Sequence, residues 1–411
     1  LGANSLASNT TASNNTAVGH AALNANTTGA NNTAVGGSAL ASLQTGGSMT
    51  AVGQGCLDAA TTASSCAAVG RSCLSAVTTG GSNVAMGDNT GNSITTNSSN
   101  TIIGSLAGNS GNISQCTVMG KGAFANAGSD NDCVFIGYNS GHNANGISQN
   151  TAVGTQSLQE SHSSNNCAFG FQAMINNTTG SGHNTAVGHS AMLDTTDGDT
   201  NTAIGAGALR VNQSGDRNTA VGHEALRNSN VDMDVLNVAV GYQAGYSSTT
   251  GYHNTFLGGE AGKNNTTGIN NVCIGVSSES VSATSSNQFT LGNSSTTTLR
   301  CNDTSIGSLS DERDKTEIID LPIGLDFINK VRPVKFKWAS RDGKQGKDGT
   351  YEAGFIAQEF QSVESSTSVD YLNLVLDDNP DKLEARPNKL FPVLIKAIQE
   401  LSAEVTALKA A

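Results

Sequence analysis

The stretch Asn15-Thr16-Ala17-Val18-Gly19 decides the fold of this chain, because it returns at nearly constant intervals. It recurs unchanged at residues 32–36, 150–154 and 218–222. Its glycine belongs to a series that runs from Gly2 to Gly292. Successive members are 17 residues apart in most cases, and 16, 18 and 19 are the only departures. A repeat of this length, held over about 290 residues, predicts a solenoid.

Apolar residues occupy fixed places around each repeat glycine. The residue directly before it is apolar in the turns from Gly19 on, and the residue two before it is mostly Ala. Adjacent apolar positions indicate a short strand with both faces buried. A second apolar pair, such as Ala22-Leu23, follows three and four residues after the glycine. We therefore predict two short strands and a polar loop in each turn, with turns stacked about 4.8 Å apart.

A single coil of this kind is too thin to be stable alone, since aromatic residues make up only 4% of the chain. The simplest cover for the second strand face is the same strand from other chains around a threefold axis. The repeat resembles the left-handed parallel β-roll of trimeric autotransporter adhesin heads and the collar repeats of phage tail fibres. The resemblance implies a homotrimer, with a mainly β solenoid stem over residues 1–296.

Composition divides the chain near residue 300. Of the 48 glycines, 42 lie before that point, whereas all five prolines and the single Trp338 lie after residue 320. The net charge of −12 comes from both regions, and no cluster of Lys and Arg forms, which disfavours a nucleic-acid partner. No run of 18 apolar residues occurs, so we expect no membrane insertion. The chain opens within a repeat at Leu1-Gly2, and we expect further residues upstream.

Most of the eight cysteines occupy repeat positions where Asn or Ala is usual, such as Cys66 and Cys73, and none of the eight forms a CxxC pair. We interpret them as buried free thiols of a chain made in a reducing cytosol, and not as a disulfide framework or a zinc site. Two further sets of residues are possible metal ligands by type, and we interpret them as exposed surface groups. They are the histidines that follow a repeat glycine (His20, His189, His223) and the aspartates of one loop (Asp194, Asp197, Asp199). We expect neither a metal nor a cofactor.

The segment Ser310-Asp311-Glu312-Arg313-Asp314-Lys315 follows the last repeat. It resembles the start of the endosialidase-type intramolecular chaperone found at the C-terminus of phage tailspikes and fibres, whose mark is Ser-Asp, then Arg, then Lys five residues after the Ser. Asp314 departs from the apolar residue that is more usual there. Residues 351–360 resemble the Gly-Phe-Ile-Ala-Gln-Glu segment of the same family. We therefore assign 297–309 as a linker and 310–411 as a small α+β chaperone domain.

Residues 391–411 are predicted to form an amphipathic helix. Its apolar residues are spaced 3, 4, 3, 4 and 3 apart, which is the seam of a coiled coil about two and a half heptads long. The helix either docks on its own domain or associates with other copies of itself. We favour a trimeric seam, because the repeat region also requires three chains.

The family resemblance implies that this domain folds first, directs trimer assembly and then cuts itself off. The hydroxyl of Ser310 would attack the carbonyl of Leu309, and Lys315 would act as the base, since no His follows residue 253. A lysine acts as a base only when it is neutral, which requires burial. Asp311 would orient Lys315 or stabilise charge. Any enzymatic activity is then a single-turnover serine endopeptidase reaction in cis, with no external substrate.

The sequence as a whole predicts a phage tail fibre, located in the virion and assembled in the host cytoplasm. Its partners would be two further copies of itself, a host surface receptor (a glycan or an outer-membrane component) and other tail proteins bound through upstream residues. Two alternatives remain open. One is a cellular trimeric surface adhesin, and the other is the stem of a glycan-degrading tailspike whose enzyme part lies elsewhere.

Overall fold

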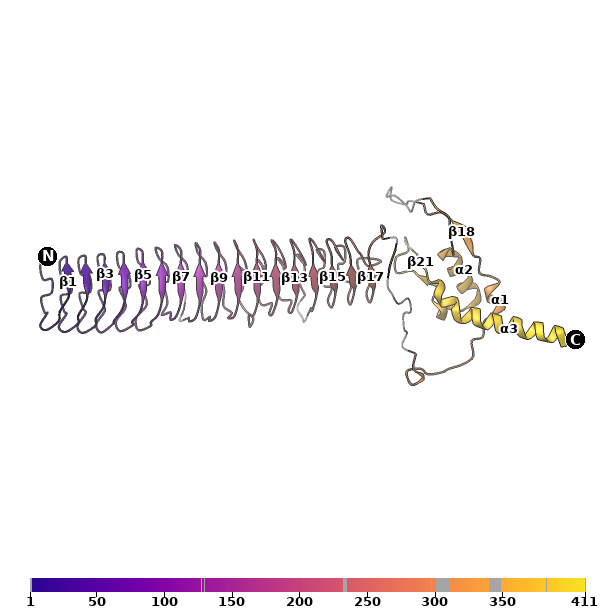
Figure 1. Ribbon diagram of the computed structural model, residues 1–411, viewed down its shortest axis with the longest axis horizontal. Coiled ribbons are helices and arrows are strands. Elements are labelled where there is room, and N and C mark those ends of the chain that lie inside the picture. The colour runs from indigo at the N-terminus through magenta and orange to yellow at the C-terminus, as the bar shows by residue number, and fades with distance from the viewer. Residues whose placement is uncertain are drawn as a thin grey trace. The chain divides into compact units, whose positions relative to one another are not determined.

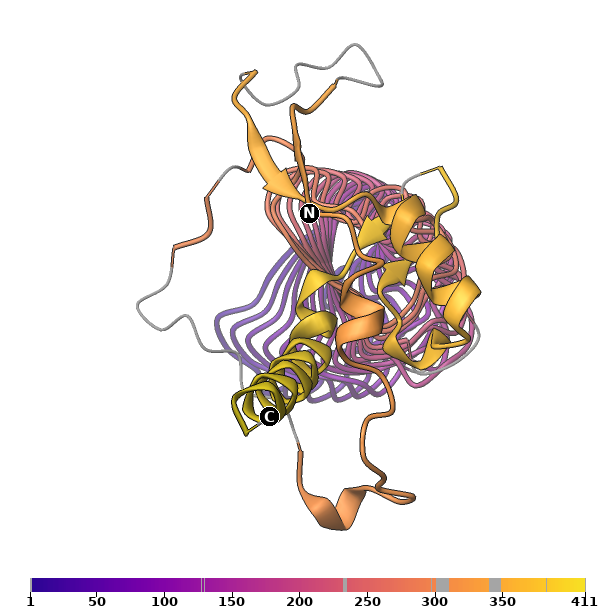
Figure 2. The same ribbon diagram turned by 90° about the vertical axis from the view of Figure 1, so that its right-hand side faces the viewer.

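The computed structural model describes residues 2–126, 128, 130–231, 235–296, 298–300, 310–339, 349–381 and 383–410. The chain forms two compact units, which we call the solenoid unit (Leu1–Thr296) and the C-terminal unit (Thr297–Ala411). Figure 1 shows the solenoid unit as a stack of similar turns, and in Figure 2 the same turns lie one behind another.

The solenoid unit carries one three-residue strand per described turn, and neighbouring strands pair in parallel (Figure 1). The register aligns like with like: Thr16 pairs with Thr33, Ala17 with Ala34, and Val18 with Val35. This confirms the predicted parallel β-solenoid. The strands are Thr16–Val18 (β1), Thr33–Val35 (β2), Thr50–Val52 (β3), Ala67–Val69 (β4), Val84–Met86 (β5), Thr101–Ile103 (β6), Thr117–Met119 (β7), Val134–Ile136 (β8), Thr151–Val153 (β9), Cys167–Phe169 (β10), Thr185–Val187 (β11), Thr202–Ile204 (β12), Thr219–Val221 (β13), Val238–Val240 (β14), Thr255–Leu257 (β15), Val272–Ile274 (β16) and Phe289–Leu291 (β17).

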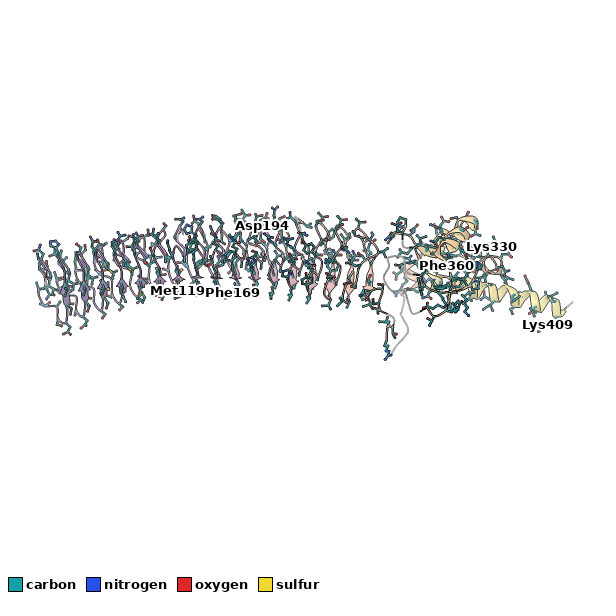
Figure 3. All side chains as sticks on the ribbon, turned by 90° about the horizontal axis from the view of Figure 1, so that it is seen from above. Met119, Phe169, Asp194, Lys330, Phe360 and Lys409 are labelled. Carbon is teal, nitrogen blue, oxygen red and sulfur yellow. The ribbon has the colours of Figure 1, made fainter. Side chains whose placement is uncertain are left out.

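Each strand buries one face and leaves the other open within a single chain. The middle residue, such as Ala17 in β1, is buried against the turn's own core in β1–β16, whereas the residues on either side of it are exposed or half-exposed. Because the third residue of every strand is apolar, these residues form a continuous column that we call the apolar stripe. Met119 and Phe169 belong to it and lie along one edge of the unit, with Asp194 on the opposite edge (Figure 3).

The prediction of a second strand in each turn is wrong. The residues around the Ala-Leu pair have positive φ, for example 56° at Ala21 and 51° at Leu23, which is the left-handed region and not extended backbone. Hydrogen bonds between turns persist here nevertheless, as from the Leu23 N–H to the Ala39 carbonyl at 3.0 Å. The Leu side chain is fully buried, so this segment closes the core without forming a strand.

The core keeps its volume nearly constant by exchanging large and small residues. At the middle of β15, Phe256 replaces the usual Ala, and Gly262 of the same turn and Gly245 of the turn before it stand where Leu is usual. A Cβ at Gly262 would lie 2.1 Å from the Phe256 ring, and one at Gly245 would lie 2.6 Å from it. The ring therefore fills the space that two leucines leave, as close packing requires.

The Asn residues four before each glycine tie successive turns together. The side-chain oxygen of Asn237 accepts from the backbone N–H of Asn254 at 2.8 Å, and its amide donates to the carbonyl of Gly251 at 2.8 Å. Direct bonds between the amides of successive turns also occur, as from Asn100 to Asn83 at 3.0 Å and from Asn218 to Asn201 at 3.2 Å. The ladder thus links side chain to backbone, and it satisfies buried polar groups inside a thin core.

Glu279, in the turn after β16, is a half-buried carboxylate and makes the stability of this end depend on pH. Burial raises its pKa from 4.5 to about 7, although the N–H of Asn264 donates to it at 3.2 Å. Between these two pH values the folded chain holds a proton that the unfolded chain releases. Stability is therefore fully present below pH 4.5 and falls as pH rises toward 7.

We expect Glu279→Gln to remove this pH dependence and to stabilise the last turns at pH 8 by roughly 1–2 kcal/mol, after discounting for solvent. The change in melting temperature between pH 5 and pH 8 measures this pH dependence. Glu260→Gln is the matched control with the opposite sign, because its hydrogen bond from Lys263 lowers the pKa of that carboxyl. Equal pH dependence in the parent chain and in Glu279→Gln would contradict the expectation.

The C-terminal unit is a small α+β assembly. Its helices are Leu325–Ile328 (α1), Ala357–Thr367 (α2) and Phe391–Ala410 (α3), with 3₁₀ turns at Glu312–Asp314 (η1), Asp370–Leu372 (η2) and Pro387–Leu390 (η3). Two antiparallel pairs complete it: Val334–Phe336 (β18) with Glu352–Gly354 (β19), and Val375–Leu376 (β20) with Glu384–Ala385 (β21). Phe327, Phe360, Leu374 and Val393 pack together in its core.

Helix α3 has two apolar faces with different surroundings. Val393 and Ala397 are buried, and the Glu400 side chain accepts from the Leu325 N–H of α1 at 2.7 Å, so one face docks on its own unit. The residues of the predicted seam all remain exposed: Phe391, Leu394, Ile398, Leu401, Val405 and Leu408. No described helix is both long enough and apolar enough to cross a membrane.

Candidate functional site

The 3₁₀ turn η1 brings two of the predicted site residues together. Lys315 ends this turn, and its Nζ lies 2.5 Å from the Oγ of Ser310 and 3.3 Å from the Ser310 carbonyl oxygen. A hydroxyl and an amine at this distance share a hydrogen bond, which is the contact that a nucleophile and its base require. The predicted cleavage residue Leu309 lies outside the described residues.

Asp311 contacts Arg313 in this turn, whereas Lys315 was the expected partner. Its carboxylate accepts from the backbone N–H of Arg313 at 2.9 Å and from the guanidinium at 3.0 and 2.6 Å. The side-chain hydrogen bonds from Arg313 lower the pKa of the Asp311 carboxyl. Asp311 therefore caps η1 and holds the loop that returns Lys315 to Ser310. Its predicted direct action on Lys315 stays a prediction.

Both members of the pair are exposed in the single chain. A role as base requires burial of Lys315, because a neutral amine is favoured only when water is excluded. That burial is not provided by the described residues of one chain. A base role for Lys315 would therefore require cover from outside the described residues of one chain, such as another copy of the chain.

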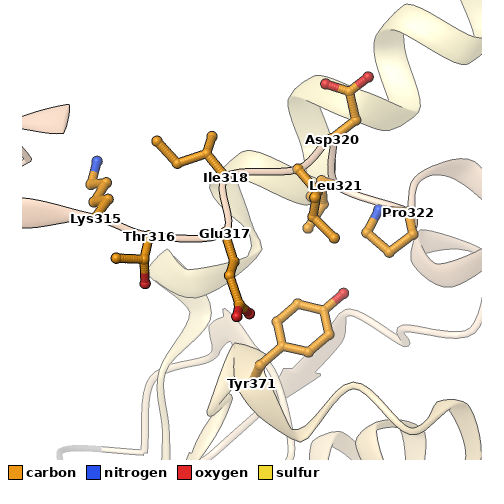
Figure 4. Close-up of a pocket in the computed structure, with 9 residues that line it drawn as sticks. Lys315, Thr316, Glu317, Ile318, Asp320, Leu321, Pro322 and Tyr371 are labelled. Carbon is orange, nitrogen blue, oxygen red and sulfur yellow. The ribbon is translucent and has the colours of Figure 1, made fainter.

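A hollow of about 540 Å³ adjoins the pair (Figure 4). It runs from Lys315 along the extended segment to Pro322, and Tyr371 of η2 closes its far side. Ile318, Ile319 and the Tyr371 ring are exposed around it. The hollow is large enough for several side chains, so an extended peptide segment beside Lys315 would fit. Sequence reasoning missed Tyr371, which no motif links to a lysine 56 positions earlier.

The other candidates do not converge on a metal site. Among the described residues, no group of three His, Cys, Asp or Glu side chains is placed to hold an ion. Asp199 instead accepts from the backbone of the preceding turn, at 2.8 Å from the N–H of Gly182. His189 and His223 lie two turns apart in the stack. The seven described cysteines are unpaired thiols, and burial raises the pKa of Cys273 to about 11.

Fold and site together define a class: a repetitive β-solenoid followed by a small α+β unit that opens on a Ser–Lys pair. Residues 310–369 match a protein-family model described as chaperone of endosialidase. The match begins at Ser310 and covers η1, α1, β18, β19 and α2. This part of the C-terminal unit is therefore similar to chaperone domains of the endosialidase type. No curated protein matches this chain.

Proposed function

We propose that this chain is the stem and assembly domain of a homotrimeric phage tail fibre. The family match supports a tail protein with a C-terminal assembly chaperone, and the solenoid supplies a stem. The stem would carry host adhesion on its loops and surfaces, in the virion, while upstream residues would join it to other tail proteins. The observation that carries the proposal is the hydrogen bond between Ser310 and Lys315 at the first residues of the matched domain.

Two exposed apolar surfaces support the trimer. The apolar stripe runs the length of the solenoid unit, and the seam of α3 lies exposed in the C-terminal unit. Surfaces this large are unusual on a monomer and mark contacts between chains. A parallel solenoid needs long loop closures and folds slowly. A separate unit that aligns three chains before the stem forms would therefore speed assembly and set the register.

The proposed reaction cuts the bond between Leu309 and Ser310. Lys315 takes the proton of the Ser310 hydroxyl as Oγ attacks the Leu309 carbonyl carbon. The C–N bond then breaks, and the Ser310 nitrogen receives that proton and becomes a free amine. The result is an ester between the Leu309 acyl group and Ser310 Oγ. Water hydrolyses this ester, leaving a Leu309 carboxylate and restoring the Ser310 hydroxyl. Release of the unit would make the stem kinetically stable, because the assembly nucleus is gone.

Intact mass spectrometry of freshly purified protein tests this mechanism. We expect the wild-type chain to appear as two fragments divided at Leu309–Ser310, and Ser310→Ala and Lys315→Met to stay at full length. Lys315→Arg is the informative conservative variant, since a guanidinium keeps the charge but cannot act as a base at neutral pH. Wild-type protein that forms trimers and keeps its full mass would remove the self-cleavage proposal.

A further inference from the structure

The column of residues directly after the repeat glycines contains a gap between two pairs of stacked rings. Phe171 stacks on His189 with centroids 5.3 Å apart and an interplanar angle of 15°. Two turns further on, His223 stacks on Tyr242 at 5.5 Å and 12°. The turn between these pairs carries Ala206 followed by Gly207, so this position of the column has no ring.

This gap is a hollow of about 230 Å³, which we call the ring slot. His189 and His223 line it along the stack, Ala206 and Gly207 form its floor, and Arg210 and Arg227 also line it. Turns repeat every ~4.8 Å, so the two imidazoles are about 9.6 Å apart. A ring inserted at the missing turn would lie about 4.8 Å from each imidazole, which is a stacking distance.

The charges of the ring slot favour an anion. Glu224 is already engaged, because it accepts from Gln243 at 2.8 Å and lies 3.3 Å from the Arg227 guanidinium. Arg210 has no such partner among the described residues, and its Nε is buried without a hydrogen bond. A buried donor left unpaired is costly, and a guanidinium pairs best with a planar carboxylate. A ring that carries a carboxylate would therefore complement the slot, where it could pair with Arg210.

We propose that the ring slot binds an acidic sugar residue of a surface polysaccharide. The C–H faces of the sugar ring would stack between His189 and His223, and its carboxylate would pair with Arg210. This inference rests on the proposed function, because it names the class of host receptor that the stem would bind, an acidic polysaccharide. It also places recognition on one side of the turns, between β11 and β13, at a hollow that interrupts the ring column.

Saturation-transfer NMR on the full chain tests the proposal with D-glucuronate as the probe. D-glucose has the same ring without the acid, and acetate has the acid without the ring. We expect transfer to glucuronate at concentrations of about 1 mM and above, and at least about tenfold weaker binding of the other two. Arg210→Gln should weaken glucuronate binding at least about tenfold, because it removes the carboxylate partner.

Ala206→Trp should abolish binding by filling the slot, and Gly37→Trp is its matched control. Gly37 occupies the same column in a distant turn and has no atom within 4 Å of an added Cβ. Equal transfer to glucuronate and glucose, or unchanged binding in Arg210→Gln, would overturn the proposal, as would no transfer to glucuronate at all. If the chain forms trimers and cleaves itself but does not bind glucuronate, the ring-slot proposal is wrong and the proposed function stands. If the chain stays monomeric and uncleaved, the proposed function is wrong, whether or not glucuronate binds.

Discussion

Gly154→Ala is expected to break the solenoid at the turn that follows β9. Gly154 has a φ of 140°, a region that residues with a side chain rarely adopt, and an added Cβ would lie 2.2 Å from the carbonyl oxygen of Gly170. Strain of this kind costs about 1–3 kcal/mol, and the overlap with backbone adds to it, because a paired neighbour cannot move away. We expect a loss of at least about 3 kcal/mol in the free energy of unfolding.

Urea unfolding followed by circular dichroism measures the loss, and limited proteolysis locates it. Gly37→Ala is the control, because Gly37 has no atom within 4 Å of an added Cβ and no strained φ. The control should unfold at the urea concentration of the parent chain. New cleavage of Gly154→Ala should map to the turns on either side of residue 154. If both variants unfold at the same urea concentration, the repeat glycine has no steric role.

Charging the apolar stripe is expected to dissociate the trimer. Burying a half-exposed Val or Ile stabilises by roughly 1 kcal/mol, so the seventeen strands contribute on the order of 10–20 kcal/mol per chain. Met119→Glu combined with Phe169→Glu would place six carboxylates along a buried interface in the trimer, and each unpaired buried charge costs several kcal/mol. The seam of α3 is short and marginal alone, so it would not hold the chains together.

Sedimentation velocity at falling protein concentration gives the mass of the particle. The wild type should sediment at three times the chain mass and the double variant at the mass of one chain. Thr28→Glu with Thr62→Glu is the control, because it adds the same charge at exposed loop threonines. A double variant that keeps the mass of a trimer would place the stripe outside the interface. A monomeric wild type would exclude the trimer itself.

The parallel solenoid was predictable because its signal repeats seventeen times, so chance departures in single turns cancel. The glycine series located the described strands, and the apolar residues beside each glycine located the core and the stripe. The second strand was not predictable in this way. Residues such as Leu23 look like strand residues by type, and only the turn of the backbone around the core puts them at positive φ.

The candidate site was predictable in its residues but not in its contacts. The spacing of Ser310 and Lys315 suits a single 3₁₀ turn, and that turn brings them to 2.5 Å. The sequence did not reveal that Arg313 would contact both oxygens of Asp311, since the five consecutive charged side chains of residues 311–315 can pair in several ways. The ring slot depends on the absence of a large side chain at Ala206 and Gly207, and it emerges only when the turns are aligned in three dimensions.

Because the strands stay in register, equivalent positions of successive turns recur at fixed intervals along the solenoid axis. The interval from Gly222 to Gly241 is 19 residues, yet Thr219 of β13 still pairs with Val238 of β14, as in turns of 17. The strand pairing is therefore kept although this turn is two residues longer than the usual one. Gain or loss of whole turns would therefore move a surface feature along the axis in steps of about 4.8 Å without disturbing its neighbours. Length and surface chemistry can then change independently of each other as such a stem evolves.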